Sequence, residues 1–92
     1  MIRSFRSQET QEIFEGNSVA AFRAMEAAAL KRLILLNAAR SLLDLSNMRS
    51  NRLEKLHADR AGQYSIRVND QYRICFRWKG VDVFDVELVD YH

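Results

Sequence analysis

The sequence predicts an α+β fold, with two to three helices in its first half and an antiparallel β-meander of three to four strands in its second. Apolar residues recur every three or four positions between residues 18 and 48, which is the period of a helix. From residue 64 onward they alternate with polar residues, which is the period of a strand. Helices followed by a meander are typical of an antiparallel sheet that is covered on one face.

The 92 residues contain no Pro, no repeat and no low-complexity tract, so nothing marks a linker between domains. A chain of this length is sufficient for one hydrophobic core but not for two. We therefore expect residues 1–92 to form a single domain.

The first half is expected to hold a short strand and then helices. Ile2–Phe5 is predicted as an N-terminal edge strand. Gln8–Glu15 is predicted as a short helix, and Gly16 follows where a left-handed C-cap is favoured. Ser18 is predicted to cap the next helix. An apolar stripe marks one face of that helix: Phe22, Met25, Ala29, Leu33, Leu36, Ala39 and Leu43. Asn37 interrupts the stripe, so one long helix and a long helix followed by a short one both remain possible.

The second half predicts a β-hairpin and one further strand. Residues 64–68 and 72–78 alternate in polarity, and Asn69-Asp70-Gln71 between them are turn formers. Lys79-Gly80 turns the chain again into a strand over residues 84–88. If the apolar residues of the hairpin face the helices, three arginines project from the opposite, open face: Arg67, Arg73 and Arg77.

Positive charge is concentrated in one part of the chain, although the net charge is only +2. Residues 49–79 contain eight Lys or Arg against three acidic residues, whereas residues 80–92 contain four acidic residues and no Lys or Arg. A concentrated basic segment is typical of proteins that bind polyanions such as RNA. A solvated surface whose charges neutralise each other after folding is the alternative.

Composition excludes several other classes. The chain is 48% hydrophobic and 28% charged, as in ordinary globular proteins. Its one cysteine, Cys75, cannot form an internal disulfide or a cysteine-based zinc site, and it fits a reducing cytosol. No apolar run is long enough for a membrane span or a signal peptide, so we expect a cytoplasmic protein without a membrane partner. We expect no cofactor and no metal, because two histidines without a clustered acid pair give no ligand spacing.

Acid–base chemistry on a phosphodiester remains as a candidate activity. RNA provides its own nucleophile, the 2′-hydroxyl group, so a protein need only move protons and neutralise charge. Histidine suits proton transfer because its ordinary pKa lies near neutrality, and arginine suits phosphate because its planar group matches two oxygens. The only histidines are His57 and His92. Taken alone, His57 is as consistent with a surface residue that has no role as with a catalytic residue. For His92 the alternative of a frayed chain end is stronger. Tyr91 would either stack on a base or pack at the end of the sheet.

Three segments resemble a known family. They are Asn51-Arg52-Leu53-Glu54-Lys55-Leu56-His57, the run Arg60-Ala61-Gly62-Gln63-Tyr64-Ser65-Ile66-Arg67-Val68-Asn69-Asp70-Gln71-Tyr72-Arg73-Ile74-Cys75-Phe76, and the ending Val89-Asp90-Tyr91-His92. They are similar to the HigB toxins, a branch of the RelE superfamily of type II toxin–antitoxin systems. Met1-Ile2-Arg3-Ser4-Phe5 matches as well, whereas residues 18–48 are only generically similar.

The resemblance implies a RelE-like fold and a ribosome-dependent, metal-independent endonuclease that cuts mRNA and arrests growth. A HigA-like helix-turn-helix antitoxin would inhibit it, and operator DNA would be bound only through that antitoxin. By the resemblance, His57, Asp90, Tyr91 and His92 are catalytic, Arg73 matches a basic sheet position and Arg60 matches a loop arginine of the family. With Arg67 and Arg77, which the alternation places on the same face as Arg73, these arginines are predicted to contact RNA or phosphate. The sequence does not decide which histidine is the general acid. Nearby carboxylates favour the charged imidazolium form of His92, which makes His92 the weak choice for that role. Some family members have a lysine soon after the mid-chain histidine. Here Ala58-Asp59-Arg60 follows, so either Arg60 supplies that charge or cleavage is slower.

Two other readings compete with the nuclease. A non-catalytic module would bind RNA or its antitoxin and act only as a transcriptional co-repressor. Direct DNA binding is weaker still, because no predicted helix is basic along one face. The nuclease is favoured because binding alone does not require His57 together with Asp90, Tyr91 and His92 beside an arginine-rich face.

Overall fold

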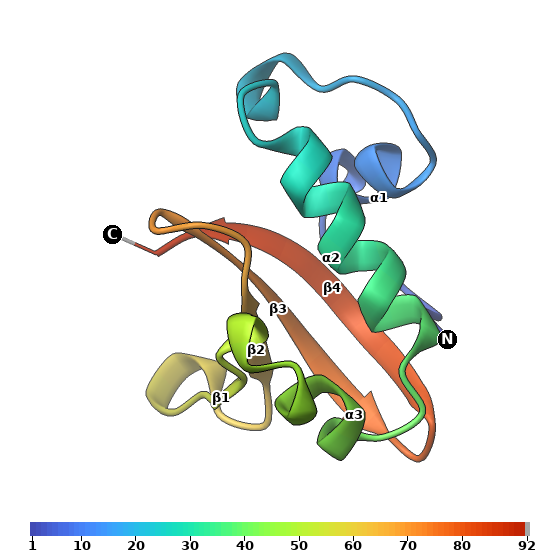
Figure 1. The fold of residues 1–92 in the computed structure, drawn as a ribbon, viewed down its shortest axis with the longest axis vertical. Coiled ribbons are helices and arrows are strands. Elements are labelled where there is room, and N and C mark those ends of the chain that lie inside the picture. Colours follow the sequence, from blue (N-terminus) through green and yellow to red (C-terminus); the bar gives the residue numbers. More distant parts are fainter. Residues whose placement is uncertain (92) are drawn as a thin grey trace.

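The structure is a computed structural model that describes residues 1–91, and His92 lies outside the described residues. Its helices are α1 (Gln8–Phe14), α2 (Glu26–Ala38) and α3 (Leu42–Asn47), with single 3₁₀ turns η1 (Ala20–Phe22), η2 (Arg49–Asn51) and η3 (Ala58–Arg60). Its strands are β1 (Glu54–Lys55), β2 (Tyr64–Arg67), β3 (Tyr72–Lys79) and β4 (Asp82–Asp90). The α2 helix crosses in front of the sheet (Figure 1). The predicted α+β order, with helices before the meander, is confirmed.

The four strands form one antiparallel sheet in the order β1-β2-β3-β4. The β2–β3 hairpin pairs Tyr64 with Phe76 and Arg67 with Arg73. Its turn is closed by the Asn69 side chain, whose Oδ1 accepts hydrogen bonds from the backbone N–H groups of Gln71 (2.9 Å) and Tyr72 (2.7 Å). Such side-chain acceptance is the reason that Asn is favoured in turns, so the predicted hairpin has the predicted turn.

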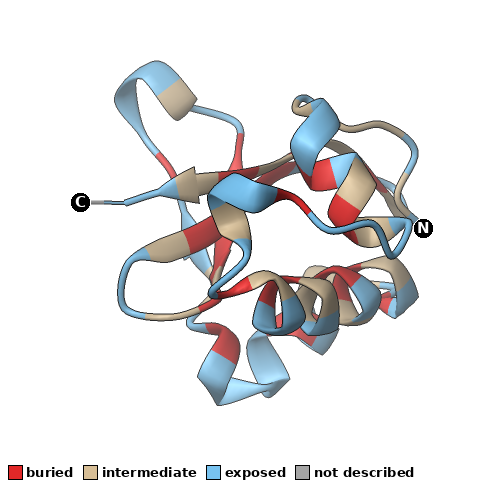
Figure 2. Ribbon diagram, turned by 90° about the horizontal axis from the view of Figure 1, so that it is seen from above, coloured by how far each residue is buried: buried red, intermediate tan, exposed pale blue. Residues whose placement is uncertain are grey.

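The hydrophobic core lies between the helices and one face of the sheet. From α2, Ala29, Leu33 and Leu36 are fully buried, and from the hairpin Ile66, Ile74 and Phe76 are fully buried as well. Figure 2 shows the buried residues along the strands and at intervals on the helices. These are the residues that the two apolar periods selected, since burial of apolar surface is the main force that drives folding. No described helix is both long enough and apolar enough to cross a membrane.

The predicted N-terminal strand is wrong: Ile2–Phe5 forms only two isolated parallel bridges, Ile2 to Val83 and Phe5 to Val86. Between these bridges β4 has a bulge, where Asp85 adopts a left-handed backbone (φ 54°). At the bulge, the Asp85 N–H donates to the Ser4 side chain (2.9 Å). A bulge interrupts the regular ladder, so the segment follows the edge of β4 without becoming a strand.

The start of the long helix also differs from the prediction. Ser18 caps no helix. Its hydroxyl instead donates to the carboxylate of Glu26, the first residue of α2, which also accepts from the Val19 N–H (3.1 Å). The helical region does divide in two, but at Ala39, whose backbone is extended (ψ 139°), and not at Asn37. The Asn37 side chain accepts from the Ile2 N–H (2.9 Å) and so attaches the N-terminus to α2.

Truncation of Leu33 tests the helix–sheet core, and its neighbour Ile34 is a matched control. Leu33 is 0% exposed and Ile34 is 54% exposed. We expect Leu33→Ala to lower the free energy of unfolding by about 2–5 kcal/mol, because it leaves a cavity. Ile34→Ala should cost less than about 1 kcal/mol. Urea unfolding of both variants measures the difference, and equal losses would contradict the assigned face of α2.

Candidate functional site

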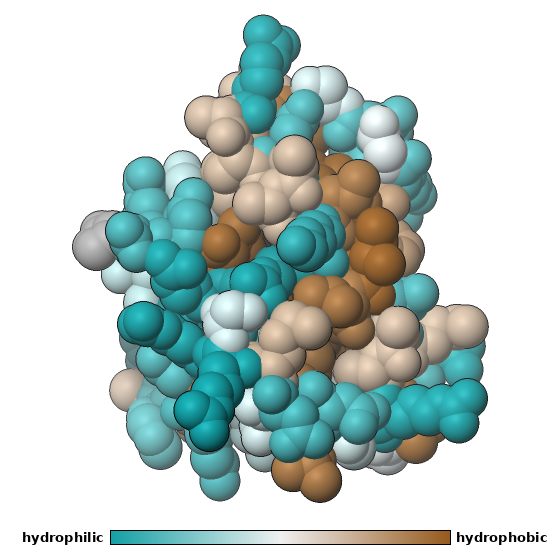
Figure 3. Space-filling model, viewed as in Figure 1, coloured by the Kyte–Doolittle hydropathy of each residue, from teal (hydrophilic) through white to brown (hydrophobic). Residues whose placement is uncertain are grey.

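The three arginines of the hairpin lie on the sheet face that is turned away from the helices, as predicted. We call this the outer face; it includes Ser65, Arg67, Arg73, Cys75, Arg77 and Glu87. The core residues Ile74 and Phe76 alternate with Arg73, Cys75 and Arg77 along β3. Hydrophilic surface gathers on the side of the molecule near β1 and the C-terminal end, whereas hydrophobic surface follows α2 (Figure 3).

The outer face is not open, contrary to the prediction. Ser65 and Cys75 are fully buried and Arg73 is only 7% exposed. The chain from η2 to η3 covers this part of the sheet: the Arg52 carbonyl accepts from Arg73, and the Arg60 side chain reaches Glu87. The sequence pattern gave no sign of this cover, because β1 has only two residues and shows no alternation of its own.

Arg73 is held by contacts to three separate parts of the chain. Its Nε donates to the Ser65 hydroxyl (2.8 Å), and its Nη2 donates to the carbonyls of Ser65 (3.2 Å) and Arg52. Its Nη1 lies 3.9 Å from the Glu54 carboxylate, and its guanidinium carbon lies 5.6 Å from the centre of the Tyr91 ring. A buried charge is tolerated only when it is paired and hydrogen-bonded, so these contacts fix Arg73 in one position.

Arg73 forms the floor of a pocket at the end of the sheet where the chain leaves β4. We call it the C-terminal pocket; it has a volume of about 220 Å³ and is lined by Arg52, Glu54, Arg67, Asn69, Asp70, Arg73 and Tyr91. Pockets for complete drug-sized ligands are roughly 300–1,000 Å³. The C-terminal pocket is smaller and more strongly charged, which fits one anionic group of a larger molecule.

The C-terminal segment is attached to the hairpin turn beside this pocket. The Tyr91 N–H donates to the Gln71 carbonyl (2.8 Å), and the Gln71 side chain donates to the Asp90 carboxylate (3.0 Å). Tyr91 remains 45% exposed, so one part of its ring covers Arg73 and the rest faces solvent. Of the predicted catalytic residues, the structure therefore brings Tyr91 into the pocket and Asp90 next to it, and His92 lies outside the described residues.

His57 and two of the predicted arginines lie outside the C-terminal pocket. His57 precedes η3, in the exposed loop just beyond the Lys55–Tyr64 pair. Tyr64 also pairs with Phe76 of β3, whereas Asp90 pairs with Tyr72 of β3. Phe76 and Tyr72 are four residues apart, which corresponds to about 13 Å along the strand. By this register, His57 is at the opposite end of the hairpin from Tyr91. Arg60 and Arg77 do not line the C-terminal pocket either; Arg77 lines a second hollow with Gly62 and Phe84.

Each predicted phosphate-binding arginine has an acidic partner within the chain. Arg60 lies 3.2 Å from Glu87 and Arg77 lies 3.4 Å from Asp85, while Arg67 pairs with Asp70. Arg73 faces Glu54, as described above. The pair of Arg77 with Asp85 is the most exposed on both sides, and such exposed pairs contribute about 0–1 kcal/mol, so there a phosphate can replace the carboxylate at little cost. The basic segment is thus less positive in the folded chain than its composition suggests.

Sequence reasoning missed four residues of the pocket: Arg52, Glu54, Asn69 and Asp70. The sequence predicts Asn69 and Asp70 only as turn formers. Arg52 and Glu54 reach the pocket because β1 pairs with β2, with Glu54 opposite Ser65. A two-residue strand has too short a pattern to predict that pairing, although the run of charges from Arg52 to Lys55 was a signal of exposed surface.

Solved structures of bacterial toxins share this fold. A YoeB–YefM toxin–antitoxin heterotetramer from Staphylococcus aureus superimposes with a TM-score of 0.58 at 18% identity and covers 100% of this chain and 98% of that chain. A YoeB/ParE toxin from Agrobacterium tumefaciens gives a TM-score of 0.52 at 15% identity and covers 95% and 98%. Identities this low establish the fold alone. The fold is that of the RelE/YoeB-like toxins.

Sequence comparison defines the family more closely. The family model for HigB-like toxins, described as the RelE-like toxin of the type II toxin–antitoxin system HigB, matches residues 3–92. Toxin HigB-1 of Vibrio cholerae serotype O1 is 43% identical over 54 residues, which make up 59% of this chain and 57% of that protein. The chain belongs to the HigB-like family of toxins.

Neutralising Arg73 and Arg67 separately tests which of them holds the pocket together. Arg73 is buried and donates to three oxygens, whereas Arg67 is partly exposed and pairs with an exposed carboxylate. Arg73→Gln should lower the free energy of unfolding by about 1–3 kcal/mol, because it leaves buried acceptors unpaired. Arg67→Gln should change it by less than about 1 kcal/mol. Urea unfolding is the measurement, and a larger loss of unfolding free energy for Arg67→Gln than for Arg73→Gln would contradict the described contacts of Arg73.

The thiol of Cys75 is expected to be unreactive in the folded protein. Burial raises its pKa above the ordinary value; Arg60 and Arg73 lower the pKa and Glu87 raises it, but burial has the largest effect. Near neutral pH the thiol is therefore protonated as well as inaccessible, and only the thiolate is nucleophilic. Alkylation should be much slower in buffer than in denaturant, and similar rates in the two would show that the outer face is open at Cys75.

Proposed function

We propose that this chain is an endoribonuclease toxin that cleaves mRNA on the ribosome and thereby inhibits translation and growth. The observation that carries the proposal is the C-terminal pocket, in which guanidinium groups and the aromatic ring of Tyr91 meet at the end of the sheet. Arginine suits the phosphate, and an exposed aromatic ring suits an unstacked base. The proposal agrees with membership of a toxin family and needs neither a metal nor a cofactor.

Cleavage would use the 2′-hydroxyl group of the RNA as the nucleophile. Its oxygen attacks the adjacent phosphorus, a base removes its proton, and an acid protonates the 5′-oxygen as the bond from phosphorus to that oxygen breaks. Arg73, which is already fixed, and Arg67 would stabilise the additional negative charge of the transition state. His92 follows Tyr91 in the sequence, so it is the histidine that we place in this chemistry at the pocket, with Asp90 orienting it.

The proposed role of His57 sets a geometric requirement. It requires the loop of residues 57–62 and the C-terminal segment to act on one phosphate, although the register sets them at opposite ends of the hairpin. Arg60 favours a connection, because its side chain crosses the outer face from this loop to Glu87 on β4. We propose that His57 acts as the second proton-transfer group and that Arg60 replaces the lysine of other family members.

We further propose that a helix-turn-helix, HigA-like antitoxin binds and inhibits the chain, and that operator DNA is bound only through that antitoxin. The support is the family, whose members are toxins of type II systems, and the YoeB–YefM structures, which are toxin–antitoxin complexes. A non-catalytic co-repressor is the second candidate. The distance of His57 from the C-terminal pocket favours it, since a protein that only binds does not need these residues together.

The pH dependence of cleavage tests the two histidines. We expect a bell-shaped profile of cleavage rate on programmed ribosomes, in which His57→Gln and His92→Gln each remove one limb and lower the rate about 10²–10⁴-fold. Lys55→Gln, an exposed charge on β1, is the control and should leave the profile intact. If His92→Gln abolishes cleavage and His57→Gln behaves like the control, His57 has no part in the chemistry.

Growth arrest separates the nuclease from the co-repressor. Induced expression of the unsubstituted chain should stop growth and produce mRNA fragments with 5′-hydroxyl ends, and Tyr91→Ala should relieve the arrest without unfolding the protein. Circular dichroism checks the fold of the variant. Normal growth and intact mRNA on induction of the unsubstituted chain would leave only the binding function.

A further inference from the structure

Arg52 has a property that no other arginine of the C-terminal pocket shares. It lines the pocket and its side chain is exposed, yet it makes no ion pair with any residue that the structure describes. Arg67 pairs with Asp70, and Arg73 is buried beside Glu54. Of the three guanidinium groups in the pocket, only that of Arg52 is neither buried nor neutralised.

The balance of charge among the residues that line the pocket also distinguishes Arg52. Its lining contains three arginines and two carboxylates, those of Glu54 and Asp70, which leaves one positive charge in excess. Within this lining, Asp70 pairs with Arg67 and Glu54 lies beside Arg73, so the excess charge of the lining residues is that of Arg52. The charge that attracts an anion into the pocket therefore depends on a residue outside the set of predicted phosphate contacts.

The backbone places Arg52 at the mouth of the pocket. Arg52 ends η2 in a left-handed conformation (φ 43°), and its carbonyl turns inward to accept from the buried Arg73. That hydrogen bond comes from the main chain, so replacement of the side chain leaves it in place. The Arg52 side chain is thus free to bind a ligand while its own backbone helps to fix Arg73.

We propose that Arg52 binds a backbone phosphate of single-stranded RNA at the C-terminal pocket and is the main electrostatic contact for its capture. This inference rests on the proposed function. Arg73 fixes the floor of the pocket and Tyr91 offers the exposed part of its ring to a base, so Arg52 is the remaining exposed arginine of the lining without a carboxylate partner among the described residues. An exposed guanidinium group without an ion pair suits the first contact, because charge attraction does not require a fixed geometry.

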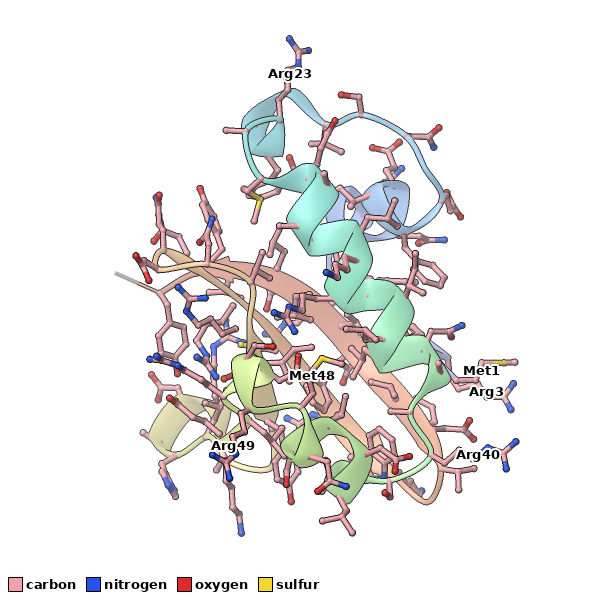
Figure 4. The ribbon with its side chains drawn as sticks, viewed as in Figure 1. Met1, Arg3, Arg23, Arg40, Met48 and Arg49 are labelled. Carbon is pink, nitrogen blue, oxygen red and sulfur yellow. The ribbon has the colours of Figure 1, made fainter. Side chains whose placement is uncertain are left out.

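Arg49 is a matched control for Arg52. It lies three residues earlier, at the start of η2, is exposed and has the same charge, but it does not line the pocket. Figure 4 shows that Arg23, Arg40 and Arg49 lie at three separate edges of the molecule. Both Arg49→Gln and Arg52→Gln remove one positive charge, so attraction of RNA by net charge would weaken equally in the two variants. A phosphate contact at the pocket would be lost only in Arg52→Gln.

The test is binding of a 2′-O-methyl RNA oligonucleotide, which the proposed chemistry cannot cleave, measured by fluorescence anisotropy over a range of salt concentrations. Arg52→Gln should weaken binding about fivefold at about 0.1 M salt and reduce the slope of log affinity against log salt by about 0.7, as for one lost phosphate contact. Arg52→Lys should restore most of both, and Arg49→Gln should change neither. Circular dichroism confirms that the variants are folded.

Equal effects of Arg52→Gln and Arg49→Gln would overturn the inference. An absence of oligonucleotide binding by the unsubstituted chain would overturn it as well. Cleavage of mRNA on ribosomes by that same preparation then tests the proposed function separately. Cleavage that does not depend on Arg52 refutes only the inference, whereas an absence of cleavage refutes both.

Discussion

The structure depends on the buried guanidinium group of Arg73. It joins β2 through Ser65, the chain before β1 through Arg52 and Glu54, and the C-terminal end through Tyr91. Because an unpaired buried charge would cost several kcal/mol, the fold can keep Arg73 only if all of these segments stay in place. The same constraint that closes the outer face also creates the C-terminal pocket.

Intramolecular ion pairs neutralise much of the positive charge of the basic segment. Its net charge along the sequence is large, but folding sets Asp70, Glu87 and Asp85 beside its arginines. The pairs keep these arginines oriented on one face and reduce long-range attraction to any nucleic acid. What remains is a local positive excess among the residues that line the C-terminal pocket, which is where we propose that RNA binds.

The sequence predicts those parts of the fold that have a long enough period. The alternation of β2 and β3 and the stripe on α2 identify the buried residues, and Asn69 identifies the hairpin turn. The predictions are wrong where a local feature determines an element's bounds. Glu26 accepts a hydrogen bond from Ser18, so α2 begins later than predicted. The bulge at Asp85 interrupts β4, so residues 2–5 do not form a strand. In the site, the arginine face was predictable, but the cover over it and the role of Arg52 depend on the two-residue strand β1.

The most direct test of the central claim is to map RNA binding on the folded chain by NMR, with the 2′-O-methyl oligonucleotide added to isotopically labelled protein. The account predicts that signals of Arg52, Arg67, Asn69 and Tyr91 shift together with one affinity, while those of Ile34 and the outer surface of α2 do not. Shifts confined to α2, or to the hollow beside Arg77 with none at Tyr91, would contradict it.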